Sequence, residues 1–125
     1  MRTSKLNRTI TLAALAALML IAWAPGIFAS GETTPVLKRV EAKKVCMVNN
    51  AVFEKDQIPV PVNGKTYYGC CEMCKERLAK DAEARTGVDP VTGKKVDKAT
   101  AVIAALPDGT VLYFESEETL KKYGQ

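Results

Sequence analysis

The sequence predicts an α+β fold made of two small modules in tandem, each a β-hairpin followed by a helix. Residues 45–78 and 91–123 share one order of features: a short apolar opening, an alternating strand, a glycine turn, an aromatic strand and a helix start. The turns, Asn63-Gly64 and Asp108-Gly109, are strong hairpin signals because both residues tolerate positive φ. A period of about 45 residues is typical of internal repeats. The alternative is a chance likeness between two hairpin-plus-helix units.

The N-terminal residues 1–29 have the pattern of a secretory signal peptide. Three basic residues precede the apolar run Ile10–Ala24, and Ala29 provides a small residue for cleavage. The alternative is an uncleaved membrane anchor, but the run is short for a span of about 20 residues. We therefore expect a periplasmic or secreted protein with no membrane contact after cleavage. The segment that follows, 30–44, is expected to be flexible.

The charge of the chain depends strongly on this leader. The formal net charge is +4, and removal of residues 1–29, which carry three basic residues and no acid, lowers it to +1. A surface that binds nucleic acid needs a basic patch or stripe, and the remaining sequence shows none, so we expect no nucleic-acid partner.

In an exported protein disulfides can persist, and the four cysteines can pair in three ways.

The first module is expected at residues 45–87. Residues 58–62, IPVPV, form a predicted strand whose two prolines lack backbone donors and place it at a sheet edge. A second strand, 66–69, returns from the glycine turn. A helix is then expected from about Cys71 to Arg85, with Gly87 as its stop signal.

The second module, residues 88–125, keeps these signals but contains no cysteine. Strands are expected at 101–106 and 110–114, followed by a short helix that Ser116 caps and that ends near Tyr123. In the alignment of the two copies, Thr92, Glu115 and Thr119 stand opposite Cys46, Cys70 and Cys74. Hydroxyls and a lone carboxylate are weak donors for soft metals. We therefore expect no second metal site, and a structural or docking role for this module.

The cysteines of the first module are candidate metal ligands. Cys70 and Cys74 lie four positions apart at the predicted helix start, so both side chains lie on one face. The unpaired N–H groups and the positive dipole end there stabilise thiolates, the form that binds metals. Cys46 comes from a separate loop and can close the site from the other side.

The neighbouring residues leave the ligand set open. Sulfur donors favour Cu(I), Zn(II) or other soft ions. Three sulfurs suit a low-coordinate ion, whereas zinc takes four ligands, the last of them Cys71 or water. Cys71 is either a fourth ligand or a small core residue on the apolar stripe of the helix. Met47 and Met73 are candidate thioether donors, although a methionine beside a core more often serves packing. Three lysines nearby in sequence can add positive potential: Lys43, Lys44 and Lys75.

At these residues the sequence resembles the TRASH and YHS group of small heavy-metal-binding modules. Cys46 followed by Cys70 and Cys74 is similar to the TRASH pattern of one cysteine and a distant C-x-x-x-C pair. GKTYYGCCEMCKERL, residues 64–78, is similar to the end of the YHS pattern, and DPVTGKKVD, residues 89–97, to its start with the cysteine replaced. The resemblance implies a treble-clef-like hairpin and helix around one metal, and a role in metal trafficking, resistance or sensing with a transport or resistance partner.

We therefore expect a metal-binding protein without catalytic activity. The chain has no histidine to serve as a general base, and it shows no nucleophile–base pair or phosphate loop. One alternative is thiol–disulfide exchange by the C-x-x-C motif of Cys71 and Cys74, although a thioredoxin-like fold needs a βαβ context. The other alternative is a structural module stapled by two disulfides.

Overall fold

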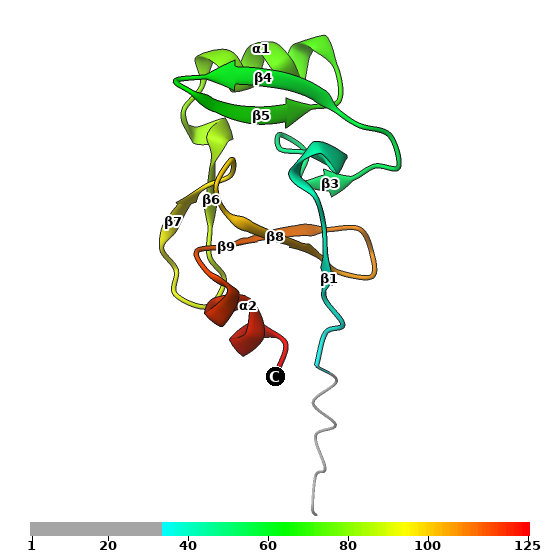
Figure 1. The fold of residues 1–125 in the computed structure, drawn as a ribbon, viewed down its shortest axis with the longest axis vertical. Helices are drawn as coiled ribbons and strands as arrows, with labels where there is room; N and C mark the ends of the chain where they lie inside the picture. Colours follow the sequence, from blue (N-terminus) through cyan, green and yellow to red (C-terminus); the bar gives the residue numbers. More distant parts are fainter. Residues whose placement is uncertain (1–33) are drawn as a thin grey trace, which may run out of the picture. The chain divides into compact units, whose positions relative to one another are not determined.

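The computed structural model describes residues 34–125, and the predicted signal peptide lies outside these residues (Figure 1). The described residues belong to one compact unit. They contain two α-helices and several small antiparallel sheets, each of two or three strands. The predicted α+β class is therefore confirmed.

The first half of the described chain contains two hairpins followed by a helix. Its elements are β2 (Val45–Cys46), β3 (Ala51–Val52), β4 (Ile58–Val62), β5 (Lys65–Gly69) and α1 (Glu72–Lys80). Asn63 and Gly64 have φ values of 50° and 76°, as predicted for the turn between β4 and β5. Among the described residues β4 pairs with β5 alone, so its prolines lie in an edge strand, as predicted.

The second half repeats the order of hairpin, hairpin and helix. Its elements are β6 (Thr86–Val88), β7 (Lys95–Asp97), β8 (Val102–Ala105), β9 (Val111–Phe114) and α2 (Glu117–Tyr123). Ser116 caps α2 and accepts the Thr119 N–H, so the predicted hairpin and cap are confirmed. The β8–β9 turn differs from the expected two-residue type, because the Gly109 N–H donates to the Leu106 carbonyl at 2.9 Å and makes a longer loop.

The helix α1 ends before Asp81, whereas the sequence predicted a helix that continues to Arg85. The Asp81 carboxylate accepts the Glu83 N–H at 2.9 Å, and a short 3-10 helix, η2 (Glu83–Arg85), follows. The Arg85 guanidinium donates to the Leu78 carbonyl at 2.6 Å, which satisfies one of the free carbonyls of the last helical turn. A side chain from beyond the helix therefore caps α1.

Gly87, expected as the stop signal of α1 and the border between the modules, lies inside β6. The second half thus begins at Thr86, since β6 pairs with β7. A Cβ at Gly87 would lie 3.1 Å from atoms of the Tyr113 side chain. Glycine at this position permits the close approach of β6 to β9 and does not end a helix.

The segment 30–44, expected to be flexible, contains two regular elements. The strand β1 (Lys38–Arg39) pairs with β8 and completes a three-stranded sheet, β1-β8-β9. The short 3-10 helix η1 (Ala42–Lys44) leads into β2. The Val40 N–H donates to the Ile103 carbonyl at 3.1 Å. Pairing with the edge of β8, a contact between distant segments, gives this part of the chain its structure.

One hydrophobic core joins the two halves. Its buried members are Val45, Met47, Val60, Tyr67 and Leu78 from the first half, and Ala84, Val96, Ile103, Val111 and Tyr113 from the residues after it. Polar contacts also cross between the halves: the Lys65 ammonium lies 2.7 Å from the Asp97 carboxylate, and the Tyr67 hydroxyl donates to the same carboxylate at 3.0 Å. The two halves therefore share a core.

Candidate metal centre

Cys46 is positioned by the turn that joins β2 to β3, residues 47–50. The Asn50 N–H donates to the Cys46 carbonyl at 2.8 Å, and Asn50 has a φ of 52°, which asparagine adopts more often than most residues. The Met47 N–H donates to the Tyr68 carbonyl at 2.8 Å and ties the turn to β5. Cys46 is fully buried at the end of β2.

Cys70 and Cys74 come from the junction of β5 and α1. A Cβ at Gly69 would lie 3.0 Å from the Cys74 Cβ, so the helix can approach the strand this closely because position 69 is glycine. Cys74 is buried, and Cys70 is partly exposed. The Asn49 side-chain amide donates to the Cys70 Sγ at 3.4 Å, which links the β2–β3 turn to the junction.

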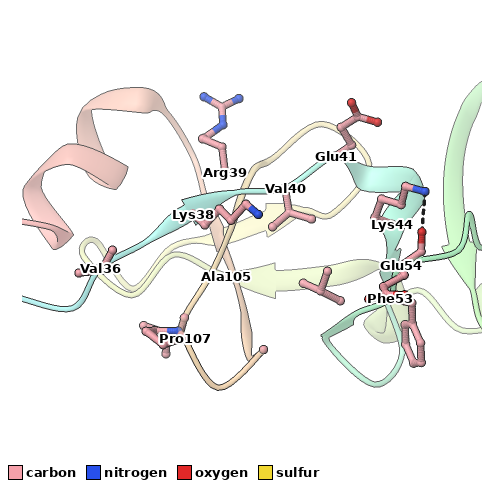
Figure 2. Close-up of a pocket in the computed structure, with 13 residues that line it drawn as sticks. Val36, Lys38, Arg39, Val40, Glu41, Lys44, Phe53, Glu54, Ala105 and Pro107 are labelled. Atoms are coloured by element: carbon pink, nitrogen blue, oxygen red, sulfur yellow. Dashed lines mark hydrogen bonds between the residues drawn. The ribbon is translucent and has the colours of Figure 1, made fainter.

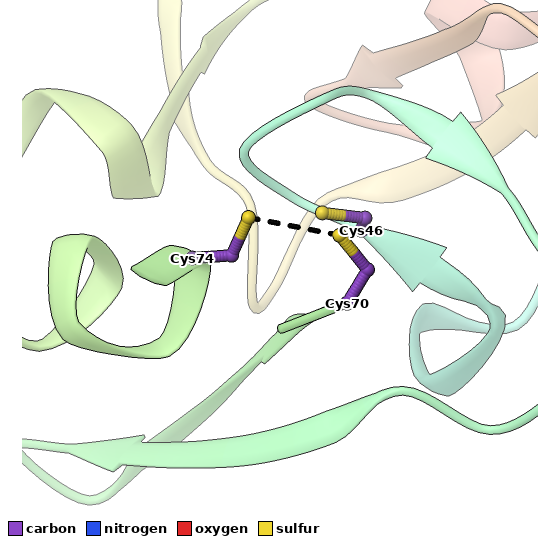
Figure 3. Close-up of side chains that lie close together, drawn as sticks. All are labelled: Cys46, Cys70 and Cys74. Atoms are coloured by element: carbon purple, nitrogen blue, oxygen red, sulfur yellow. Dashed lines mark hydrogen bonds between the residues drawn. The ribbon is translucent and has the colours of Figure 1, made fainter. Parts of the chain in front are cut away.

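The three thiols that the sequence pointed to lie together (Figure 3). The Sγ atoms of Cys46, Cys70 and Cys74 are all within 4.8 Å of one another, and those of Cys70 and Cys74 are 3.6 Å apart. In a tetrahedral site with metal–sulfur bonds of about 2.3 Å, neighbouring sulfurs are about 3.8 Å apart. The group can therefore hold one metal ion.

The surroundings of these thiols shift their acidity in opposite directions. Burial raises the pKa of Cys46, but the N–H groups of Asn49 and Val48 and the Cys70 thiol outweigh this effect and lower it. Burial and the neighbouring thiols raise the pKa of Cys74 to about 12. A metal that binds all three thiolates must therefore displace protons at neutral pH, and its affinity should rise with pH.

Cys71 lies outside this group. It is exposed at the N-cap of α1, so its interpretation as a small core residue is wrong. Its Sγ is 3.4 Å from that of Cys74, which keeps Cys71 as a candidate fourth ligand on the exposed side. Of the two methionines considered as donors, Met47 is part of the core and Met73 is 80% exposed.

The three lysines expected to add positive potential pair with carboxylates. The ammonium groups of Lys43 and Lys44 lie 3.9 and 2.6 Å from the Asp56 carboxylate. Lys75 lies 3.4 Å from Glu72. These lysine side chains are 34–47% exposed, and solvent screens such pairs. Their sequence proximity to the cysteines therefore overstates their effect on the thiols.

The second half presents a different residue at the place of Cys46. The Gly93 N–H donates to the Asp89 carbonyl at 2.8 Å, just as the Asn50 N–H donates to the Cys46 carbonyl at 2.8 Å. Gly93 and Asn50 both have positive φ. Asp89 is thus the structural equivalent of Cys46, and the alignment of Cys46 with Thr92 is wrong. The N-caps of α1 and α2 agree with the other two alignments, Cys70 with Glu115 and Cys74 with Thr119.

The Asp89 carboxylate lies where the β6–β7 turn meets the junction of β9 and α2, the corner of the second half that corresponds to the thiol group of the first half. It is fully buried and accepts the N–H groups of Val91, Thr92 and Glu115 at 2.8, 3.2 and 2.8 Å. Burial raises the pKa of Asp89, but these N–H groups and the Thr119 hydroxyl outweigh burial and lower it. A charged carboxylate therefore occupies the corner where the first half has thiols. In the sequence Asp89 is only the first residue of DPVTGKKVD, and that pattern gives no signal of its burial or of its contact with the Glu115 N–H.

A groove of about 730 Å³ lies beside β1 and the β8–β9 turn (Figure 2). Val36, Val40, Phe53 and Pro107 give it apolar walls, and charged side chains surround them. At one end the Lys44 ammonium donates to a backbone carbonyl, that of Glu54, at 2.8 Å. No cysteine is among the residues that line the groove, so it is separate from the thiol group.

Comparison with known proteins provides no relative: no protein-family model, curated protein or solved structure matches this chain. Within residues 34–125, no helix combines the length and the apolar character needed to cross a membrane. The interpretation of the thiol group therefore depends on its geometry and on the sequence resemblance described above.

Proposed function

We propose that this chain binds one soft metal ion, Cu(I) or Zn(II), through the thiolates of Cys46, Cys70 and Cys74. The observation that carries this proposal is the approach of three Sγ atoms, from β2, the β5–α1 junction and α1, to within 4.8 Å of one another. Thiolates are soft donors that select such ions. Cys46 and Cys74 are also buried, which limits the access of water to the metal.

We further propose that the protein handles this metal outside the cytoplasm, in heavy-metal trafficking, resistance or sensing with a transport or resistance partner. The leader pattern of residues 1–29 supports export. The resemblance of residues 46–78 to TRASH and YHS modules supports the metal role, with β4, β5 and α1 as a treble-clef-like frame. The second half then serves as a metal-free support, and no catalytic role is proposed.

Titration of cysteine variants tests the ligand set. We expect Cys46→Ser, Cys70→Ser and Cys74→Ser each to weaken Cu(I) binding by about a hundredfold or more, because a hydroxyl is a hard, weak donor for a soft ion. Cys71→Ser is the matched control, and we expect it to change the affinity less than about tenfold. Competition with a chromogenic Cu(I) chelator measures all four dissociation constants.

Two outcomes would contradict this assignment. An equal loss in Cys71→Ser would show a site of four thiolates, and unchanged binding in the other three variants would show that the group is not the metal site. The same series with Zn(II) tests whether zinc recruits Cys71 as its fourth ligand, as its tetrahedral preference favours.

A second function, thiol–disulfide exchange, is favoured by one observation. Cys71 is exposed at the start of α1, and its Sγ is 3.4 Å from that of buried Cys74, an arrangement in which an exposed thiol attacks and a buried one resolves. All four cysteines are free in the structure. Mass spectrometry of trapped thiols, on protein purified without reductant, discriminates the functions. Bound metal with four free thiols supports metal binding, a Cys71–Cys74 disulfide without metal supports exchange, and two disulfides support a stapled module.

A further inference from the structure

Lys98 is a buried cation in the turn that follows β7. Lys98 is only 6% exposed, whereas lysine is almost never fully buried unless it is paired. Within residues 34–125, no carboxylate forms an ion pair with its ammonium. Nothing in the sequence singles it out among the 18 lysine and arginine residues. The position of this charge therefore needs an explanation.

The partners of Lys98 are neutral groups, two of them in the turn that follows Cys46. Its Nζ donates to the Met47 carbonyl at 2.6 Å and to the Asn50 Oδ1 at 3.0 Å. The ammonium also lies 5.1 Å from the centroid of the Tyr113 ring. Met47 and Asn50 are the two ends of the turn that follows Cys46. A residue of the second half thus holds the turn that positions a candidate ligand of the first half.

The loaded site would carry negative charge. Three thiolates around a monovalent ion leave two negative charges, and around a divalent ion they leave one. Buried charge is costly unless an opposite charge offsets it. Burial lowers the pKa of Lys98 below its ordinary value, and negative charge on Cys46 offsets only part of this effect. The Lys98 ammonium donates to the carbonyl of Met47, the residue that follows Cys46, so its charge lies beside the turn that presents a candidate ligand.

We propose that Lys98 is a positioning residue and the counter-charge of the metal–thiolate group, an inference that rests on the proposed metal site. Its hydrogen bonds to Met47 and Asn50 fix the turn that presents Cys46. Its positive charge offsets the negative charge of the loaded site. The second half, although it lacks thiols, thus contributes to metal binding without supplying a ligand.

The test compares Cu(I) and Zn(II) affinities in the whole chain carrying Cys71→Ser, so that both ions meet the same three thiolates. Lys98→Met removes the charge, and Lys98→Arg keeps it. We expect Lys98→Met to weaken Cu(I) binding by about a hundredfold and Zn(II) binding by about tenfold. When the metal displaces the thiol protons, the site gains two negative charges with Cu(I) and one with Zn(II), and the electrostatic energy scales with this gain. Lys98→Arg should restore most of both affinities.

Lys95→Met is the matched control, because Lys95 lies on β7 with its side chain 70% exposed. It removes one positive charge three residues before Lys98, and we expect less than about a threefold change for either ion, since solvent and salt screen an exposed charge. If Lys98→Met does not fold, Lys98→Gln gives the same comparison, since its amide keeps a donor without the charge.

The possible results separate this inference from the proposed function. Equal losses of Cu(I) and Zn(II) affinity in Lys98→Met would overturn the counter-charge role, because a loosened turn weakens the binding of both ions alike. Unchanged affinities would overturn the whole inference and leave the metal site intact. Failure of the unsubstituted chain to bind either ion would instead overturn the proposed function.

Discussion

Gly69 controls how closely α1 approaches β5 at the cysteine group. An added Cβ would lie 3.0 Å from the Cys74 Cβ and 3.1 Å from the Lys75 backbone nitrogen, so the backbone of the strand or of the helix must move to make room. We predict that Gly69→Ala lowers the free energy of unfolding by roughly 1–3 kcal/mol, as overpacking does. It should also weaken Cu(I) binding by about tenfold. Urea denaturation and chelator competition measure the two effects.

Gly124→Ala is the control for this substitution. Its Cβ would meet no atom closer than 3.8 Å, so we expect a change of less than about 0.5 kcal/mol and unaltered metal affinity. A Gly69→Ala variant as stable as this control, with full Cu(I) affinity, would show that the close approach of helix and strand is not required.

Single residues differ in how far the sequence reveals their roles. The proximity of Cys70 and Cys74 could be predicted because it follows from local spacing at a helix start, and Cys46 followed from the family-like pattern. Lys98 could not be predicted, because its role depends on contacts with Met47 and Asn50, far away in the chain. The same is true of the contact between Asp89 and the Glu115 N–H.

At the scale of elements, the two halves use one order of hairpins and helix but close the same corner differently. In the first half thiols from β2, the β5–α1 junction and α1 meet. In the second half the Asp89 carboxylate joins the β6–β7 turn to the N–H that follows β9. Hydrogen bonds to a buried charge thus connect the elements that a metal would connect in the first half.

We predict that Asp89→Asn destabilises the fold by about 2 kcal/mol, because hydrogen bonds to a charged group are lost and a new N–H faces existing donors. The pKa of Asp89 is lowered from its ordinary value of 3.8, so the folded state favours the charged form. Its contribution should be complete above that value and disappear as the pH falls through the lowered pKa. Urea denaturation of wild type and variant from pH 7 to acid checks both statements.

Asp108→Asn is the matched control. The Asp108 carboxylate also accepts a backbone N–H, that of Thr110 at 2.8 Å, but it is exposed, so we expect less than about 1 kcal/mol of destabilisation. An Asp89→Asn variant no less stable than this control at neutral pH would mean that the carboxylate does not hold the corner together.

Local signals were predicted best, although the β8–β9 turn differs from the expected type. The Asn63-Gly64 turn and the Ser116 cap depend on neighbouring residues, and both are present. The end of α1 was missed because Arg85 caps it from outside the helix. The strand β1 was missed because its one partner among the described residues, β8, is remote in sequence.

At the scale of the whole molecule, a bound metal would cross-link three elements of a small core. We predict that a hundredfold excess of Cu(I) over its dissociation constant stabilises the reduced protein by about 2.7 kcal/mol. For a domain of this size the gain corresponds to a rise in Tm of roughly 10–20 °C. Thermal melts with and without Cu(I), under reducing conditions, measure the shift.

The control for the melts is Cys74→Ser, which lacks one proposed ligand and should show little or no shift at the same Cu(I) concentration. Identical melting curves for the unsubstituted protein with and without Cu(I), despite proven binding, would contradict the view that the metal links elements of the fold.

The central claim is that one soft metal ion is held by sulfur atoms alone, from Cys46, Cys70 and Cys74. X-ray absorption spectroscopy of the protein loaded with one equivalent of Cu(I), in the Cys71→Ser background, tests this claim most directly. We predict a first coordination shell of three sulfur atoms and no nitrogen or oxygen. A shell that contains nitrogen or oxygen, or fewer than three sulfurs, would contradict the assignment of the three cysteines as the metal site.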